Sequence, residues 1–209
     1  MWGGEEMVEK GFFEDILNKD LRWPQPNDRP FVAVGTSSEN TYVAGDYFTR
    51  LVLMIAGYKR SADLLVETCV KDPRDSAILV FPIVFNYRHF IELSIKYQLA
   101  TFGPAVGIEP NWKSHNLKVL WAEFLKMLNC FEGVVQKETE DAVQLIVFEF
   151  AENDQGSFLF RYPVDGNGIS LPITYPVLYL PTLRDVMNGV SGYFAGCDGY
   201  LSDLNNTGL

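Results

Sequence analysis

The chain is poor in the residues that build metal centres and disulfide frameworks. Its 209 residues include two histidines and three widely spaced cysteines, Cys69, Cys130 and Cys197. Neither a C-x-x-C pair nor an H-E-x-x-H motif occurs, and two histidines cannot complete a zinc site of ordinary spacing. We therefore expect no metal and no cofactor. Each cysteine lies in an apolar run, which predicts buried, reduced thiols in a cytoplasmic protein.

Positive charge is also scarce. Lys and Arg number 17 against 27 Asp and Glu, which gives a net charge of -10 and a pI of about 4.7. Broad binding of a phosphate backbone needs clustered basic residues, so the balance disfavours it but leaves room for a small basic pocket. The N-terminus lacks the apolar core of a signal peptide, and charges interrupt the apolar runs. We therefore expect no membrane span.

Apolar residues are plentiful, at 47% of the chain, and they recur at three- and four-residue steps. This period predicts helices. The expected helices cover residues 41–70, 76–102 with Pro82 near the start, 114–128 after the cap Ser114, 139–151, and 182–204 after a capping box of Thr182 and Asp185. The run within 139–151 also fits a strand. Residues 153–181, rich in Gly and Pro, predict an irregular or short-strand insertion.

The predicted fold is therefore an all-α bundle of four to five helices with this insertion before the last helix. Residues 42–204 form the predicted domain, and residues 205–209 a C-terminal tail. Residues 1–41 read as an appendage, with a short amphipathic helix over 7–17 and an extended, proline-rich loop.

The last predicted helix carries a row of glycines at helical spacing, Gly189, Gly192, Gly196 and Gly199. Each glycine costs about 1 kcal/mol of helix propensity relative to alanine. Four of them indicate a face that another helix approaches closely, either in a homodimer or within the chain.

The second predicted helix contains a polar stripe within the stretch FNYRHFIELSIKYQL. Arg88, His89, Glu92 and Lys96 fall in one sector about 100° wide, with Glu92 four residues from each of the other two charges. The stripe is either a solvent-facing set of ion pairs, worth about 0.3–0.5 kcal/mol each, or the lining of a cleft on a central helix. His115 follows Ser114, so it reads as a first-turn residue whose neutral form the helix dipole favours, or as a solvated neighbour of the cap.

Three stretches together resemble HEPN-type proteins (higher eukaryotes and prokaryotes nucleotide-binding). YRHFIELSIKYQL resembles their Arg-His-x-x-Glu-Leu helix, and SHNLKVLWAEF resembles their His-Asp-Leu helix with its Leu-Trp, with Asn116 in place of Asp. DQGSFLFRYPVDGNG resembles a segment found downstream. The resemblance covers about residues 42–204.

HEPN domains are helical, often dimeric, and many act in toxin–antitoxin or phage-defence systems. Their best-known activity is metal-independent RNA cleavage by an Arg-x(4–6)-His motif, which this chain lacks. Here Arg88 and His89 are adjacent, and His115 lies 27 positions beyond Arg88.

The resemblance implies a site in which His89 and His115 serve as base and acid, Arg88 or Arg161 supplies the cation, and Glu92 orients a side chain. Lys96, Arg161 and Tyr162 would contact the substrate. The implied partners are RNA or a nucleotide, a second copy of the chain, and a cognate antitoxin or other protein. The alternative is a noncatalytic helical interaction module whose polar cluster is structural.

Arg161 lies between Phe160 and Tyr162 in the FLFRYP run. An extended backbone would send the aromatic residues to one face and Arg161 to the other. We expect Arg161 to make a charge-assisted hydrogen bond to Glu92, to Asp154 or to a bound anion.

Overall fold

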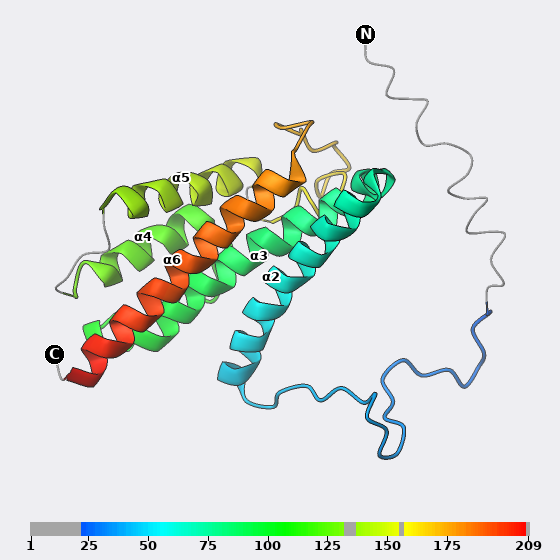
Figure 1. The fold of residues 1–209 in the computed structure, drawn as a ribbon, viewed down its shortest axis with the longest axis horizontal. Helices are drawn as coiled ribbons and strands as arrows, with labels where there is room; N and C mark the ends of the chain where they lie inside the picture. The colour runs from blue at the N-terminus through cyan, green and yellow to red at the C-terminus, as the bar shows by residue number, and fades with distance from the viewer. Residues whose placement is uncertain (1–21, 132–136, 155–156, 208–209) are drawn as a thin grey trace, which may run out of the picture. The chain divides into compact units, whose positions relative to one another are not determined.

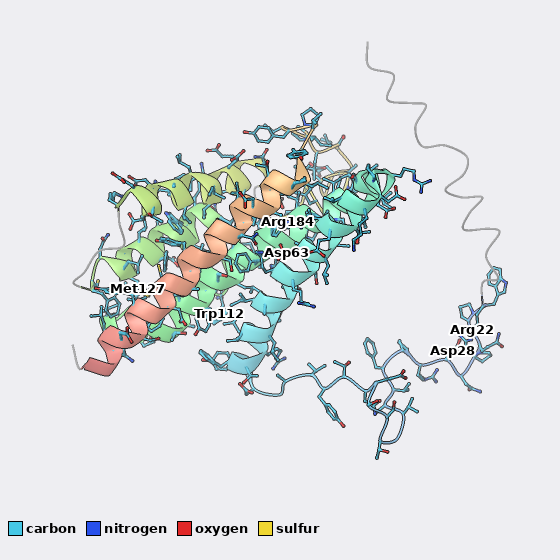
Figure 2. The ribbon with its side chains drawn as sticks, in the orientation of Figure 1. Arg22, Asp28, Asp63, Trp112, Met127 and Arg184 are labelled. Atoms are coloured by element: carbon cyan, nitrogen blue, oxygen red, sulfur yellow. The ribbon has the colours of Figure 1, made fainter. Side chains whose placement is uncertain are left out.

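The computed structural model describes residues 22–131, 137–154 and 157–207, and the chain divides into two units between Tyr42 and Val43. In the first unit, residues 22–42 form turns and irregular backbone. The guanidinium of Arg22 holds the carboxylate of Asp28 (Figure 2), which also accepts a 2.7 Å hydrogen bond from the Gln25 amide. The helix expected over residues 7–17 lies outside the described residues.

The second unit is an all-α bundle, as the periodicity predicts (Figure 1). Its described residues contain one isolated β-bridge, between Val164 and Ser170, and no strand. Two short 3-10 turns, Pro73–Asp75 and Gly103–Val106, flank the second of its described helices. The five helices are α2 (Tyr47–Lys71), α3 (Ser76–Phe102), α4 (Leu117–Leu128), α5 (Lys137–Asn153) and α6 (Leu180–Thr207).

The expected bounds of α3 are confirmed, including Pro82 inside its first turns. The strand alternative for residues 139–151 is wrong, because Val143, Val147 and Ala151 bury one helical face of α5 at four-residue steps. Asp46 sets the start of α2: its Oδ1 accepts a 2.7 Å hydrogen bond from the Thr49 amide, so the helix begins later than residue 41.

Two predicted N-caps are wrong. Asn116, not Ser114, caps α4, because its Oδ1 accepts hydrogen bonds from the Lys118 and Val119 amides at 3.0 and 3.3 Å. His115 therefore precedes the helix instead of lying in its first turn. The last helix already begins at Leu180, so the expected capping box, with Thr182 at its head, lies inside α6.

The middle of the bundle is α3, which contacts α2, α4 and α6 (Figure 1). Buried residues occur around its whole circumference, as expected of a central helix. By length and hydropathy the helical stretch Pro73–Val106 passes as a membrane span, and 56% of its most apolar window is buried inside the fold. A helix at the core of a bundle passes the same test of length and hydropathy, because it is apolar on every side.

The thiols and the glycine row each correct an expectation. All three cysteines are free, and Cys69 and Cys197 are buried, but Cys130 is exposed because it follows the last turn of α4. Apart from the neighbouring residues of the helix itself, no atom of the described residues lies within 4 Å of the position that a Cβ would take at any of the four glycines of α6. Close packing of this face against another described helix is therefore wrong, and a homodimer through it stays a prediction.

Candidate functional site

The polar stripe of α3 is buried, so the solvent-facing interpretation is wrong for its three charged residues. The exposed fractions of Arg88, Glu92 and Lys96 are 0%, 1% and 3%. Glu92 bridges the two cations as its spacing predicts: Oε2 accepts from Arg88 Nη1 at 3.1 Å, and Oε1 accepts from Lys96 Nζ at 2.9 Å. A charge buried this deeply persists only where partners replace water.

Both cations also reach the loop before α4. Arg88 Nη2 donates a 2.7 Å hydrogen bond to the carbonyl of His115, and Lys96 Nζ donates a 3.2 Å bond to the carbonyl of Trp112. The side chain of His115 returns to the same place, with Nδ1 2.9 Å from Glu92 Oε1. His115 thus lies beside Arg88 and Glu92, as the site implied by the resemblance requires.

A fourth charge completes the cluster from the end of α5. Asp154 Oδ2 lies 3.4 Å from Arg88 Nε, while Asp154 Oδ1 accepts hydrogen bonds from the Phe158 and Leu159 amides at 2.6 and 2.9 Å. Ser157, which lies between Asp154 and Phe158 in the sequence, adopts a left-handed φ of 68°. We call Arg88, Glu92, Lys96 and Asp154 the ion network; its formal charges cancel, and it fastens two loops to α3.

Glu92 stays ionised within this network. Burial alone raises the pKa of a carboxyl group, but the hydrogen bond from Lys96 and the charges of Lys96 and Arg88 outweigh it, so the pKa of Glu92 is lowered. An ionised carboxylate can only accept hydrogen bonds, so Nδ1 of His115 must be the donor in its contact with Glu92. This fixes the tautomer of the neutral imidazole: Nδ1 carries the hydrogen and Nε2 keeps its lone pair.

His115 is the accessible member of the cluster. Its side chain is 60% exposed, although its partner Glu92 is buried. A buried carboxylate that orients an exposed imidazole is the arrangement found in acid–base dyads. Lys96 and Arg88 could contact a ligand directly only by leaving their present partners, because both are enclosed.

His89 belongs to a different group of side chains. Its ring stacks on Phe85 at 5.6 Å between centroids and 10° between planes, and meets Tyr58 edge-on at 4.4 Å. Burial lowers the pKa of His89, with further effects from the charges of Glu92, Arg88, Lys96 and His115. The neutral imidazole is therefore favoured.

Arg161 continues this group instead of joining the ion network. Its guanidinium carbon lies 5.6 Å from the Phe85 ring centroid, 5.3 Å from that of Phe158 and 5.7 Å from that of Tyr162, and its Nε donates to the Ser157 carbonyl. We call the set of Tyr58, His89, Phe85, Arg161, Phe158 and Tyr162 the aromatic row.

The expected bond from Arg161 to Glu92 or Asp154 is wrong, because Arg161 Nε donates to the Ser157 carbonyl and the guanidinium lies against aromatic rings instead; an anion partner stays a prediction. The expected extended backbone is also wrong. Residues 158–162 form a turn, in which the Arg161 and Tyr162 amides donate to the Phe158 carbonyl at 3.0 and 2.9 Å. Tyr162 is half exposed.

A pocket of about 220 Å³ opens beside the ion network and is lined by Arg88, Asn116, Lys118 and Asp154, among others. Lys118 Nζ pairs with Glu152 Oε1 at 2.8 Å across it. Sequence reasoning missed the role of Asp154 as the fourth charge, and it missed Phe85 and Tyr58 as stacking partners. The Asp in the DQGSF stretch was the available signal for the first of these; apolar periodicity hid the other two as ordinary core residues.

Over the described ranges, no group of three or more His, Cys, Asp or Glu side chains could hold a metal ion. Comparison of the chain with family models, with curated proteins and with solved structures gives no match. The fold and site define the class: a helical bundle with a buried, charge-balanced network beside an exposed histidine.

Proposed function

We propose that the protein binds RNA and cleaves it without a metal ion, as an intracellular, cytoplasmic HEPN-like protein of the defence or toxin–antitoxin kind. The observation that carries the proposal is the Glu92–His115 pair, in which a buried, ionised carboxylate leaves the exposed imidazole with a free lone pair on Nε2. The resemblance of the three sequence stretches to HEPN-type proteins supplies the substrate class.

In this proposal His115 Nε2 takes the proton of a ribose 2′-OH, whose oxygen attacks the neighbouring phosphorus. The leaving 5′ oxygen takes its proton from solvent water, and the proton held by His115 returns to the solvent, so the products carry a 2′,3′-cyclic phosphate and a 5′-OH. The phosphorane needs a cation, and Arg161 is assigned that role. Arg88 supports the assignment, because it binds the His115 carbonyl and also pairs with Asp154, which precedes Arg161 in the sequence. Through these contacts one residue of α3 holds both loops.

The aromatic row supports the binding half of the proposal. Aromatic side chains and arginine stack on unpaired bases, and each such contact is worth about 1–3 kcal/mol without needing a basic surface. Such binding is compatible with a net charge of -10, which disfavours recognition through the phosphate backbone alone. A cognate antitoxin or a second copy of the chain would be its protein partner.

The test is to incubate purified protein with total RNA, with and without EDTA, and to analyse the ends of the products. We expect cleavage that EDTA leaves unchanged, cyclic phosphate ends, and a loss of about 100-fold or more in rate for His115→Ala. Glu109→Ala, an exposed change in the same loop, is the control. Wild-type protein that leaves RNA intact, or His115→Ala that cleaves at the wild-type rate, contradicts the catalytic proposal.

The second candidate is a noncatalytic interaction module, and one observation favours it. Every charged group of the ion network is paired within the chain, which is what a structural network requires. In that case His115→Ala melts like the wild type, and the wild-type protein neither binds nor cleaves RNA.

A further inference from the structure

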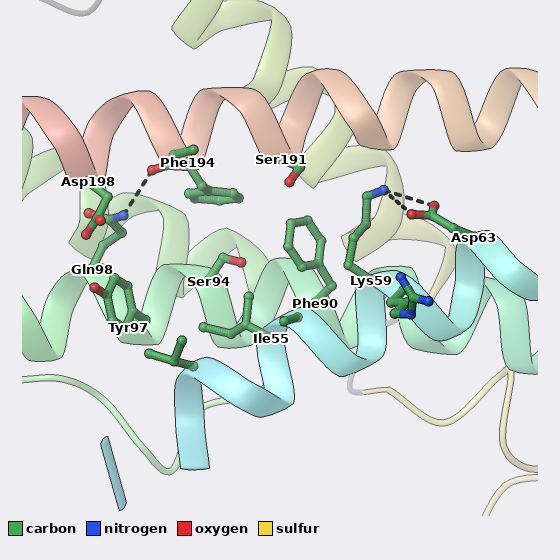
Figure 3. Close-up of a pocket in the computed structure, with 14 residues that line it drawn as sticks. Ile55, Lys59, Asp63, Phe90, Ser94, Tyr97, Gln98, Ser191, Phe194 and Asp198 are labelled. Carbon is green, nitrogen blue, oxygen red and sulfur yellow. Dashed lines mark hydrogen bonds and ion pairs between the residues drawn. The ribbon is translucent and has the colours of Figure 1, made fainter. Parts of the chain in front are cut away.

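A second pocket lies on the other side of α3 from the ion network. It measures about 460 Å³ and opens between α2, α3 and α6 (Figure 3). Phe90, Ser94 and Gln98 line it from α3, and each lies two residues from a member of the ion network, hence on nearly the opposite face of the helix. The volume is within the range of about 300–1,000 Å³ that is usual for small-molecule sites.

The middle of this pocket is apolar and aromatic. The rings of Phe90 and Phe194 lie 6.4 Å apart between centroids at 82° to each other, and Ile55 closes the side formed by α2 (Figure 3). Ala56 and Ala195, both small and exposed, stand at the α2 and α6 sides of the opening. A flat or slender apolar body of a ligand fits such walls.

One end of the pocket has buried hydrogen-bond acceptors without partners. Ser94 and Gln98 are 3% and 2% exposed, and within the part of the chain that the structure describes Ser94 Oγ, Gln98 Oε1 and Asp198 Oδ1 make no hydrogen bond. Gln98 Nε2 donates to the Phe194 carbonyl at 3.2 Å (Figure 3), which leaves its oxygen for another partner. Burying such a group without a partner destabilises the fold, so these atoms point to a ligand that donates hydrogen bonds.

The other end of the pocket holds its positively charged side chains. Lys59 Nζ donates to both oxygens of Asp63 at 2.9 and 2.7 Å and to Asn188 Oδ1 at 2.7 Å, which uses its three hydrogens. Asp63 Oδ1 also accepts a 2.8 Å bond from the Tyr87 hydroxyl. Arg60, which is exposed, lines the pocket as well. Among the described residues, the buried side-chain atoms of the pocket that lack a hydrogen bond are Ser94 Oγ, Gln98 Oε1 and Asp198 Oδ1, and each of them can accept one.

We propose that this pocket binds a small organic cation, in which a primary ammonium or an amidinium is attached to an aromatic or aliphatic body. The charged group donates to Asp198 Oδ1 and Gln98 Oε1, with Ser94 Oγ as a further acceptor, and the body lies between Phe90 and Phe194. An ionised carboxylate and an amide oxygen are the pair that an N–H-rich cation satisfies best, because charge-assisted hydrogen bonds are about twice as strong as neutral ones.

The test uses three compounds with one body: 4-phenylbutylamine, 4-phenylbutanol and 4-phenylbutyrate, each titrated calorimetrically into the full chain up to about 5 mM, the affinity range of ligands this small. We expect the amine to bind at least about tenfold more tightly than the alcohol, and the carboxylate to bind more weakly than either. Asp198→Asn keeps the side-chain size and removes the charge. It should weaken the amine about tenfold and leave the alcohol unchanged.

Two further variants complete the design. Asp185→Asn makes the same chemical change on an exposed position of α6 and should alter no affinity. Ala195→Phe fills the opening and should weaken the binding of the amine and of the alcohol alike. If circular dichroism shows that Asp198→Asn fails to fold, Ala195→Phe alone tests whether the amine binds in this pocket. The proposal is overturned if the amine does not bind, if the carboxylate binds as tightly, or if the amine binds the two pocket variants as it binds the wild type.

Discussion

Replacement of Arg88 by methionine tests the ion network most directly. Methionine keeps the length and apolar character of the side chain, but it removes the donors to Glu92 and to the His115 carbonyl and the ion pair with Asp154. Lys96 still neutralises Glu92, whereas Asp154 Oδ2 loses its one ionic partner. Removing one member of a buried ion pair costs about 3–5 kcal/mol, because the remaining charge is buried and uncompensated.

We therefore expect Arg88→Met to lower the free energy of unfolding by about 3–5 kcal/mol, measured by urea denaturation followed by circular dichroism. A domain of this size loses about 2–4 °C in melting temperature per kcal/mol, so the melting temperature should fall by roughly 6–20 °C. The double variant Arg88→Met/Asp154→Asn should recover part of the loss, because asparagine can still accept from the loop amides but carries no charge.

Arg184→Met is the matched control. Arg184 lies on α6 (Figure 2) and its Nη1 is 3.8 Å from Glu67 Oε1, but both side chains are partly exposed. Such a pair contributes about 0–1 kcal/mol. If Arg88→Met cost no more than Arg184→Met, or if the double variant were no better than the single one, the buried charges would not be holding the two loops and the reasoning would be refuted.

Two further predictions concern His89 and the glycine face. The pKa of His89 is lower in the folded state, so as the pH drops the unfolded chain binds a proton at this residue before the folded chain does. The free energy of unfolding should therefore fall as the pH drops below about 6.5. His89→Phe should flatten the dependence of that free energy on pH between about pH 7.5 and 5.5. An unchanged slope would contradict this. Light scattering at micromolar concentration should give twice the 23.7 kDa chain mass, and Gly196→Leu, whose Cβ lies more than 4 Å from every described residue outside its own stretch of helix, should return the monomer. A wild type that scatters as 23.7 kDa would rule out the dimer.

The helices could be predicted from the sequence because burial on one or more faces imposes the 3.6-residue period directly on the apolar residues. Several of their first residues could not, since neighbouring residues compete for the same cap. Ser114 and Asn116 are both good N-caps, and only the path of the preceding loop decides that Asn116 takes the amides of α4. The alternating FLFRY pattern indicated a strand, but Asp154 accepts the next loop amides and Ser157 turns the chain at a positive φ.

One part of the candidate site could likewise be predicted from the sequence, and another part could not. The meeting of His115 with Glu92 followed from the spacing of the stripe and from the tendency of consecutive helices to pack together. The partner of Arg161 could not be deduced, because the sequence does not show which cations reach Glu92 and Asp154. Arg88 pairs with both carboxylates and Lys96 with Glu92, whereas Arg161 lies against the aromatic rings.

The buried charges themselves bear on what the site is for. An apolar replacement of a buried ion network is often neutral or stabilising, so stability alone does not account for four charges in the core. What these four do that apolar residues could not is fix carbonyl and amide groups of two irregular segments at defined atoms: Trp112 and His115 before α4, Phe158 and Leu159 after α5. Apolar packing is tolerant of small displacements, whereas a charge-assisted hydrogen bond fixes both a distance and a direction. The network therefore matters most where His115 and Arg161 must keep their places, which is where the proposed chemistry lies.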